Sequence, residues 1–177
     1  MSMDDGARPA AWLTVLAGPS GVGGGGVVGM VRARTPWVWV SVPVTTRPIR
    51  DHEVDGEDRR FVDRAEFERM IVGGQLLEWA ECGGHLFGTP AEPIRARLDL
   101  GRPVLLKIDL SGARQVRAAM PGARLVFLAP PGTHCHADVE REFDTTVVND
   151  CVERATDQLV GLLGCSFLTP ARPHASG

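Results

Sequence analysis

A run of glycines directly after an apolar segment is the feature that most constrains the fold of this chain. Residues 12–17 (WLTVLA) are apolar and β-prone, and they end at a glycine, as a buried strand does. The stretch GPSGVGGGG follows at 18–26, and a helix is expected over 27–34. A glycine-rich loop between a strand and a helix is typical of a phosphate-binding loop, whose backbone N–H groups surround phosphate at a helix N-terminus.

Strand-like and helix-like segments alternate along the remaining chain. This order predicts an α/β fold with a parallel sheet covered by helices on both faces. The segment 81–88 is expected to be a loop. Further strands are expected at 37–42, 76–80, 103–110, 124–128 and 145–148, and further helices at 65–73, 93–100, 111–120 and 152–163.

Composition excludes several classes of protein. The chain has 177 residues and a formal net charge of −3, which suits one domain and disfavours nucleic acid or an anionic membrane as partner. No apolar run is long enough to cross a bilayer, and the N-terminus lacks the order of a signal peptide. The four cysteines have neither the density nor the spacing of a disulfide framework. A cytoplasmic location is therefore expected.

A series of motifs over residues 12 to 163 resembles the guanylate kinase family in order and spacing. The resemblance implies a P-loop nucleoside-monophosphate-kinase fold that transfers phosphate from ATP to GMP with Mg²⁺. The motifs are GPSGVG (18–23), SVPVTTRPIR (41–50), EVDGEDRRFV (53–62), EFERMI (66–71), LLEWAE (76–81), LFGTP (86–90), VLLKIDLSGARQV (104–116) and VVND (147–150). The implied organisation is one domain over 10–164, with its core at 10–42 and 98–164, a GMP-binding region at 43–97, and flexible termini at 1–9 and 165–177.

The phosphate loop departs from this family pattern. The family carries a lysine that contacts the transferring phosphate and, two residues later, a Ser or Thr that holds Mg²⁺. Here Gly24 and Gly26 stand at these positions. The loss of both groups, within four successive glycines, predicts a poorly preorganised loop that binds ATP and Mg²⁺ weakly or not at all. The degenerate loop comprises Gly18, Ser20, Gly21, Gly23, Gly24 and Gly26.

The lid is the second departure. After Pro130 and Pro131 the family continues with a helix and an arginine-rich lid, whereas here about 15 residues lead to the strand that ends in VVND. That length is too short for two helices and a lid. Loss of one arginine of this kind costs roughly 10³-fold or more in rate, so efficient phosphorylation of GMP is not expected. Core exposed by the missing helices makes a homodimer a reasonable hypothesis.

The acceptor side keeps more of the family's residues. By motif, Arg47 and Arg50 match the arginines that hold the GMP phosphate, and a planar guanidinium suits this role. Glu78 matches a carboxylate that accepts from guanine N–H groups, Thr89 a hydroxyl near the base, and Asp109 a carboxylate near the base and metal. Buried carboxylates require partners, which are either a polar ligand or other groups of the protein.

Three substitutions alter this side. Pro43 stands where the family has a base-contacting Ser, and Arg59 and Phe87 stand where it has two phosphate-binding tyrosines. Arg59 replaces a hydroxyl with a charged donor, while Phe87 donates nothing. These substitutions favour a shift of ligand identity away from GMP, so the expected ligand is either GMP or a related anion.

Lys107 is the single lysine among 19 basic residues. It occupies the position of the first acid in the family's acidic-x-acidic strand end, two residues before Asp109, and alternation places both side chains on one side of the strand. This end lies beside the phosphate loop. Three roles stay open for Lys107 in the emptied pocket: an ion pair with Asp109, an anion site, or an acid/base or amine group.

Histidine and cysteine residues gather in two places without the spacing of a zinc site, so no metal is expected. They are Cys82 and His85 near the acceptor side, and His134, Cys135 and His136 in the shortened lid. No base is placed beside a cysteine, so a catalytic role for these residues has little support.

Four functions remain open from the sequence. The first is a pseudokinase that binds GMP or a related anionic ligand, without a cofactor. The second is a repurposed enzyme of specialised metabolism whose catalytic residues are Lys107, Asp109 and Glu78. The third is a phosphopeptide or protein-interaction module, as in the guanylate-kinase-like domains of scaffold proteins. The fourth is a weak residual guanylate kinase.

Overall fold

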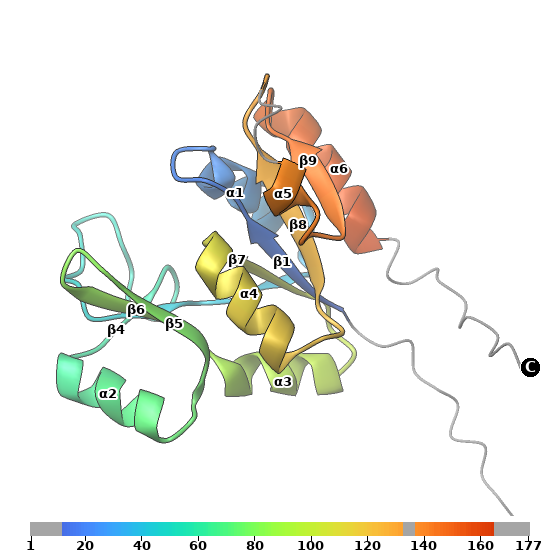
Figure 1. The fold of residues 1–177 in the computed structure, drawn as a ribbon. Coiled ribbons are helices and arrows are strands. Elements are labelled where there is room, and N and C mark those ends of the chain that lie inside the picture. The colour runs from blue at the N-terminus through green and yellow to red at the C-terminus, as the bar shows by residue number, and fades with distance from the viewer. Residues whose placement is uncertain (1–11, 133–136, 165–177) are drawn as a thin grey trace, which may run out of the picture.

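A five-stranded parallel sheet forms the centre of the computed structural model, which describes residues 12–132 and 137–164 (Figure 1). The strand order is β2-β7-β1-β8-β9. Because β1 pairs in parallel with both β7 and β8, the loop that follows β1 opens at the carboxyl edge of the sheet, where ligands of α/β proteins bind. The strands are β1 (Leu13–Ala17), β2 (Trp39–Val40), β7 (Val104–Ile108), β8 (Arg124–Ala129) and β9 (Thr145–Val148).

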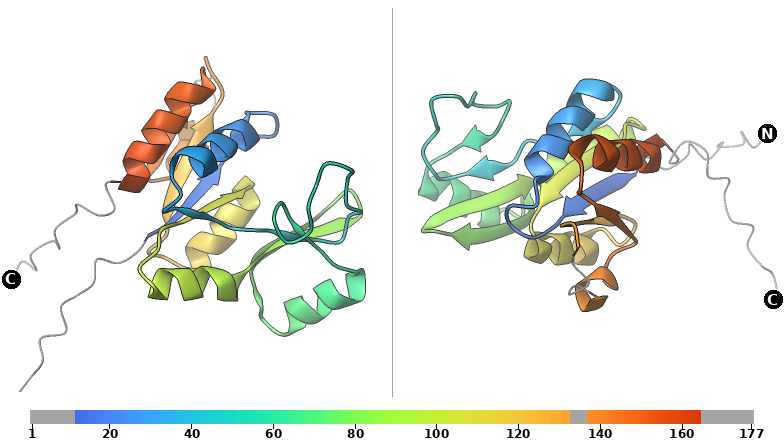
Figure 2. Two further views of the ribbon diagram at one scale, coloured as in Figure 1. Left: turned by 180° about the vertical axis from the view of Figure 1, so that it is seen from behind. Right: turned by 90° about the horizontal axis from the view of Figure 1, so that it is seen from above.

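Helices cover both faces of this sheet, as the alternating segments predict (Figure 2). Helices α1 (Gly24–Arg34) and α6 (Val152–Gly164) pack on one face, and α3 (Ala91–Asp99) and α4 (Leu110–Ala119) pack on the other. Along β1, Leu16 faces the first pair of helices, while its neighbours in the strand face the second pair. Burial on both faces explains why the strands are continuously apolar.

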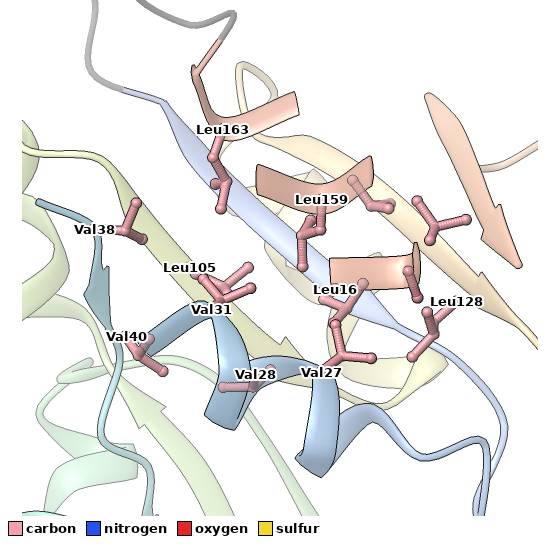
Figure 3. Packing of buried hydrophobic residues seen from close by; sticks show 13 residues of the cluster. Leu16, Val27, Val28, Val31, Val38, Val40, Leu105, Leu128, Leu159 and Leu163 are labelled. Atoms are coloured by element: carbon pink, nitrogen blue, oxygen red, sulfur yellow. The ribbon is translucent and has the colours of Figure 1, made fainter. Parts of the chain in front are cut away.

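Helix α1 begins at Gly24, three residues before the expected start. Three of the four successive glycines therefore form its first turn, and only Gly23, with φ of 81°, belongs to the loop. Figure 3 shows the reason: Val27 and Val31 pack against Leu159 of α6 and the sheet. This burial stabilises the helix despite the low helix propensity of glycine.

A second, four-stranded sheet of order β4-β3-β6-β5 extends from the main sheet (Figures 1 and 2). Helix α2 (Arg64–Val72) packs Phe67 and Met70 against it. The expected loop over 81–88 is wrong, because β5 and β6 form a hairpin there. Gly83 and Gly84, both with positive φ, form its two-residue turn. The strands are β3 (Val44–Thr45), β4 (Arg60–Phe61), β5 (Leu76–Cys82) and β6 (His85–Pro90).

The segment between β8 and β9 is short, as expected. Within its described part it forms one brief helix, α5 (Ala137–Glu140). None of the helices in the described ranges has the length and apolarity needed to cross a membrane.

Candidate functional site

A cavity of about 630 Å³ lies at the carboxyl edge of the main sheet. Three parts of the chain line it: the loop after β1 with the first turn of α1, the end of β7, and the facing side of the second sheet. The structure thus brings together most of the residues singled out in the sequence, whereas Gly26, Arg47 and Arg50 stand outside the lining. The sequence-predicted residues that line the cavity are Gly18, Ser20, Gly21, Gly23, Gly24, Arg59, Glu78, Phe87, Thr89, Lys107 and Asp109.

The loop after β1 is held at both of its ends. A side chain at Gly18 would collide with the carbonyl oxygen of Leu128, so the close approach of the loop to β8 requires glycine there. At the other end, Asn149 donates from Nδ2 to the carbonyl of Val22 at 2.7 Å. The VVND motif at the end of β9 therefore fastens the loop from a distant part of the chain.

Glu78 and Thr89 form the polar wall opposite the loop. Glu78 is only 7% exposed, and its Oε1 accepts a hydrogen bond from Thr89 Oγ1 at 2.6 Å. Burial raises the pKa of the Glu78 carboxyl, and the negative charge of Asp109 raises it further, while the bond from Thr89 opposes both. Within the described ranges no group donates to Oε2 of Glu78, which leaves this oxygen for a ligand.

Arg47, Arg50 and Arg59 gather around one carboxylate, that of Glu53. Arg47 donates to it at 2.8 and 2.5 Å, the backbone N–H of Arg50 donates at 3.0 Å, and Arg59 Nε lies 3.7 Å away. Burial lowers the pKa of Arg59, and repulsion from Arg47 and Arg50 lowers it further. Asp58 is a second carboxylate that acts on Arg59, so three arginines with two carboxylates leave a net positive charge that suits a phosphate.

Lys107 lies against Gly24. A Cβ built on Gly24 would stand 2.8 Å from Lys107 Cε and 3.7 Å from its Cδ. The alternative of an ion pair with Asp109 is wrong, because no carboxylate of the described residues lies within ion-pair distance of Lys107. Asp109 instead caps α4, where its Oδ1 accepts from the Gly112 N–H at 2.7 Å.

The residues around the loop do not fit a magnesium ion. Mg²⁺ prefers oxygen ligands, yet Gly26 has no hydroxyl, and the position of the family's first acid holds the ammonium of Lys107. In the part of the chain that the structure describes, no group of three or more His, Cys, Asp or Glu side chains is placed to hold a metal. Cys82 and His85 flank the hairpin turn, and Cys82 is exposed. His134, Cys135 and His136 lie outside the described residues.

Three polar or charged residues that line the cavity were missed from the sequence, namely Arg32, Ser41 and Asp58. Arg32 stands eight residues after Gly24 on α1, and both residues line the cavity. Ser41 is 6% exposed, and its Oγ has no hydrogen-bond partner within the described ranges. Ser41 begins the motif SVPVTTRPIR, but nothing in its sequence context marks its hydroxyl as unpaired.

Comparisons with known proteins agree with this geometry. The guanylate kinase family model matches residues 11–138. The guanylate kinase of Thermobifida fusca (strain YX) is 57% identical over 94 residues, which cover 53% of this chain and 48% of that protein. The guanylate kinase of Frankia casuarinae is 54% identical over 94 residues, 53% of this chain and 51% of that protein. The chain thus spans about half the length of the curated relatives it matches.

A solved structure resembles the whole fold. The guanylate kinase from Anaplasma phagocytophilum superposes with a TM-score of 0.77 and 27% identity, covering 95% of this chain and 92% of that one. Together with the family match over most of the chain, the motifs and the cavity lead to one conclusion: the chain belongs to the guanylate kinase family.

Proposed function

We propose that this protein binds GMP, or a closely related guanine-type anion, on the acceptor side of its cavity and has lost efficient transfer of phosphate from ATP. The observation that carries the proposal is the open oxygen of the buried Glu78, which lies in the same cavity as Arg59. A buried carboxylate with one unpaired oxygen selects a ligand that donates hydrogen bonds.

The base is recognised by Glu78 and Thr89. Guanine presents two neighbouring N–H donors, at N1 and at the exocyclic N2, and a carboxylate accepts from both. Thr89 holds Oε1 of Glu78 at 2.6 Å and fixes the plane of the carboxylate. Adenine presents a ring acceptor at the same place, so its approach to Glu78 is unfavourable. This contrast favours guanine over adenine at the acceptor side.

The phosphate is held by the arginine cluster. Arg47 is fixed by Glu53, and Arg59 brings a guanidinium to the cavity lining, where the family has tyrosine. Arg50 has no ion pair within the described ranges, so its guanidinium is available to a ligand. A phosphate monoester dianion would neutralise the excess positive charge of this cluster.

Loss of transfer is supported by what the donor side lacks. Gly24 and Gly26 replace the loop lysine and hydroxyl, and the surrounding residues do not fit Mg²⁺. The segment 130–144 contains one arginine, Arg141. Its side chain is 81% exposed and lies 3.7 Å from Asp138, not in the cavity. Arg141 thus does not replace the lid arginines that stabilise a transferring phosphoryl group.

A second candidate is ordinary guanylate kinase activity. It is favoured by the names of the relatives, which are 54 to 57% identical over the 94 aligned residues. A phosphopeptide or protein-interaction module has less support, because the large exposed apolar side chains are scattered over different elements. These are Trp37, Ile49, Val54, Val72, Trp79, Leu100 and Val148.

Two measurements test the proposal. Calorimetric titration should give binding of GMP and much weaker binding of AMP. The Glu78→Gln variant should have a lower affinity for GMP than the wild type. A coupled assay of ADP formation from ATP and GMP with Mg²⁺ should give a rate roughly 10³-fold or more below that of a relative with an intact loop and lid. Rapid ADP formation would instead establish the second candidate. Absence of GMP binding would favour a repurposed enzyme that uses Lys107, Asp109 and Glu78, or an interaction module.

A further inference from the structure

The side chain of Lys107 occupies the space beside Gly24 that a side chain at position 24 would otherwise fill. Lys107 lies at the carboxyl end of β7, paired in register with Leu16 of the central strand, and its side chain runs along the first turn of α1. A Cβ at position 24 would meet Lys107 Cε at 2.8 Å and Leu128 Cδ2 at 3.5 Å. Any side chain there would displace the lysine. The glycine that replaced the loop lysine thus makes room for a lysine from another strand.

We propose that Lys107 serves as the phosphate-binding cation of this loop, and that with the N-terminus of α1 and the hydroxyl of Ser41 it forms a metal-free site for a phosphate-type anion. The site lies on the donor side of the cavity. It is separate from the acceptor side formed by Glu78, Thr89 and Arg59, and it does not depend on GMP binding.

The N-terminus of α1 is uncapped. Gly23 provides no side-chain cap, and the first turn contains no acidic residue. The first helical hydrogen bonds run from Gly26 and Val27 to the Gly23 carbonyl, so within the described ranges the N–H groups of Gly24 and Gly25 have no acceptor. The positive end of the helix dipole is therefore left unneutralised.

Lys107 adds a full positive charge at this place. Its side chain is exposed to the cavity and makes no ion pair within the described ranges. None of the three carboxylates in the lining pairs with Lys107: Asp109 accepts from the Gly112 N–H, Glu78 Oε1 from Thr89, and Asp58 from the Val54 N–H. An ammonium beside a helix N-terminus, with no anion of the protein between them, favours an anionic ligand.

Ser41 gives an independent indication of a ligand. Its backbone N–H donates to Leu105 on β7, two residues before Lys107. Ser41 is more than nine-tenths buried and lines the same cavity. Its Oγ has no hydrogen-bond partner within the described ranges. Buried hydroxyl groups are normally hydrogen-bonded, so an unpaired one in a cavity lining points to a group that occupies the cavity.

The same arrangement makes the site independent of metal. An ammonium and a divalent cation repel each other, and the family's acid at this position has become Lys107. Two sources supply such an anion, free inorganic phosphate or diphosphate and the polyphosphate of a nucleotide. Their shared chemistry is a tetrahedral oxyanion.

The test is calorimetric titration of diphosphate, inorganic phosphate and ATP into the full chain, with EDTA present. Diphosphate should bind to the wild type. Lys107→Met, which keeps the length of the stem and removes the charge, should weaken binding at least about 10-fold. Arg102→Met is the matched control, because it removes one positive charge at the opposite end of the same strand and should leave the affinity within about 2-fold. Gly24→Ala should also weaken binding, because it displaces Lys107.

The titrations distinguish the two sources of the anion and can overturn the proposal. Tighter binding of ATP than of diphosphate would identify a nucleotide as the source of the anion, and the reverse would identify a free anion. The proposal is overturned if wild type binds neither, if both methionine variants bind like wild type, or if binding requires Mg²⁺. The thermal midpoint of each variant checks that it folds. A separate GMP titration of the wild type reports the acceptor side, so failure of this site and failure of the proposed function are distinguishable.

Discussion

Glu53 holds Arg47 through two hydrogen bonds, with Oε2 accepting from Nη1 at 2.8 Å and Oε1 from Nη2 at 2.5 Å. The same carboxylate accepts from the backbone N–H of Arg50 at 3.0 Å. Glu53 therefore fixes the segment between β3 and β4 and sets where its arginines can lie. The hydrogen bonds from Arg47 make the largest contribution to lowering the pKa of Glu53, and the Arg50 N–H lowers it further. Together they bring this pKa from 4.5 to about 2.

Stability should depend on Glu53 in a defined range of pH. Because its pKa is lower in the folded chain, its ionised form stabilises the fold above pH 4.5, and this contribution is lost as the pH falls toward 2. The difference in unfolding free energy between wild type and Glu53→Gln should be largest near neutral pH and shrink below pH 4.5. Urea unfolding at several pH values measures it. Glu57→Gln, an exposed neighbour, is the control, and an equal effect of both variants would contradict the assignment.

Recognition of the base should depend on the charge of Glu78. Since burial raises the pKa of this carboxyl, it becomes protonated at a higher pH than an exposed glutamate and then accepts poorly from guanine N–H groups. Guanosine, which has no phosphate to titrate, should therefore bind less well as the pH falls through this raised pKa. Glu78→Gln should cost about 10- to 100-fold at neutral pH. Calorimetry measures both effects, and Glu81→Gln on the same strand should change neither. A guanosine affinity independent of pH would argue against this role.

Arg59 should act on the phosphate and not on the base. Arg59→Gln removes one of the three clustered guanidinium groups, so GMP affinity should fall by about 10-fold or more while guanosine affinity stays constant. The GMP affinity of this variant should also depend less on salt concentration. Arg60→Gln is the neighbouring control, since Arg60 pairs with Glu66 on the exposed side at 2.6 Å. Equal losses for GMP and guanosine would show that Arg59 acts on the fold instead.

The packing of α1 and α6 against each other and the main sheet should contribute much of the stability of the fold. Leu159 is fully buried beside Val27 and Val31, so Leu159→Ala should lower the free energy of unfolding by about 2–5 kcal/mol. The adjacent exposed residue, Gln158, provides the control. Gln158→Ala should change the free energy of unfolding by less than about 0.5 kcal/mol. Denaturant unfolding compares them. A small loss for Leu159→Ala would mean that α6 packs less tightly than its burial indicates.

The regular elements were largely predictable, because burial leaves a periodic trace in the sequence. The continuous apolar run of β1 and the spacing of Phe67 and Met70 in α2 predict their elements correctly. The hairpin over 81–88 was missed because its polar strand residues have the composition of a loop, although the Gly83–Gly84 pair is a hairpin signal.

The candidate site was predictable in its membership and not in its pairings. Motifs indicate which residues approach the cavity, and Glu78, Thr89 and Lys107 all line it. Side-chain partners depend on geometry in three dimensions. Asp109 serves as a helix cap instead of a partner for Lys107, and the sequence spacing of two residues fits both arrangements. The unpaired hydroxyl of Ser41 leaves no trace in the sequence for the same reason.

The bond from Asn149 to Val22 has a consequence for the order in which the protein matures during synthesis. The glycine loop leaves the ribosome before the amide that fastens it, because Asn149 is made 127 residues after Val22. The strands that flank β1 in the sheet, β7 and β8, are also made after the loop. The nascent chain therefore presents an unfastened loop while these residues are made, and the pocket is completed only when β9 is in place.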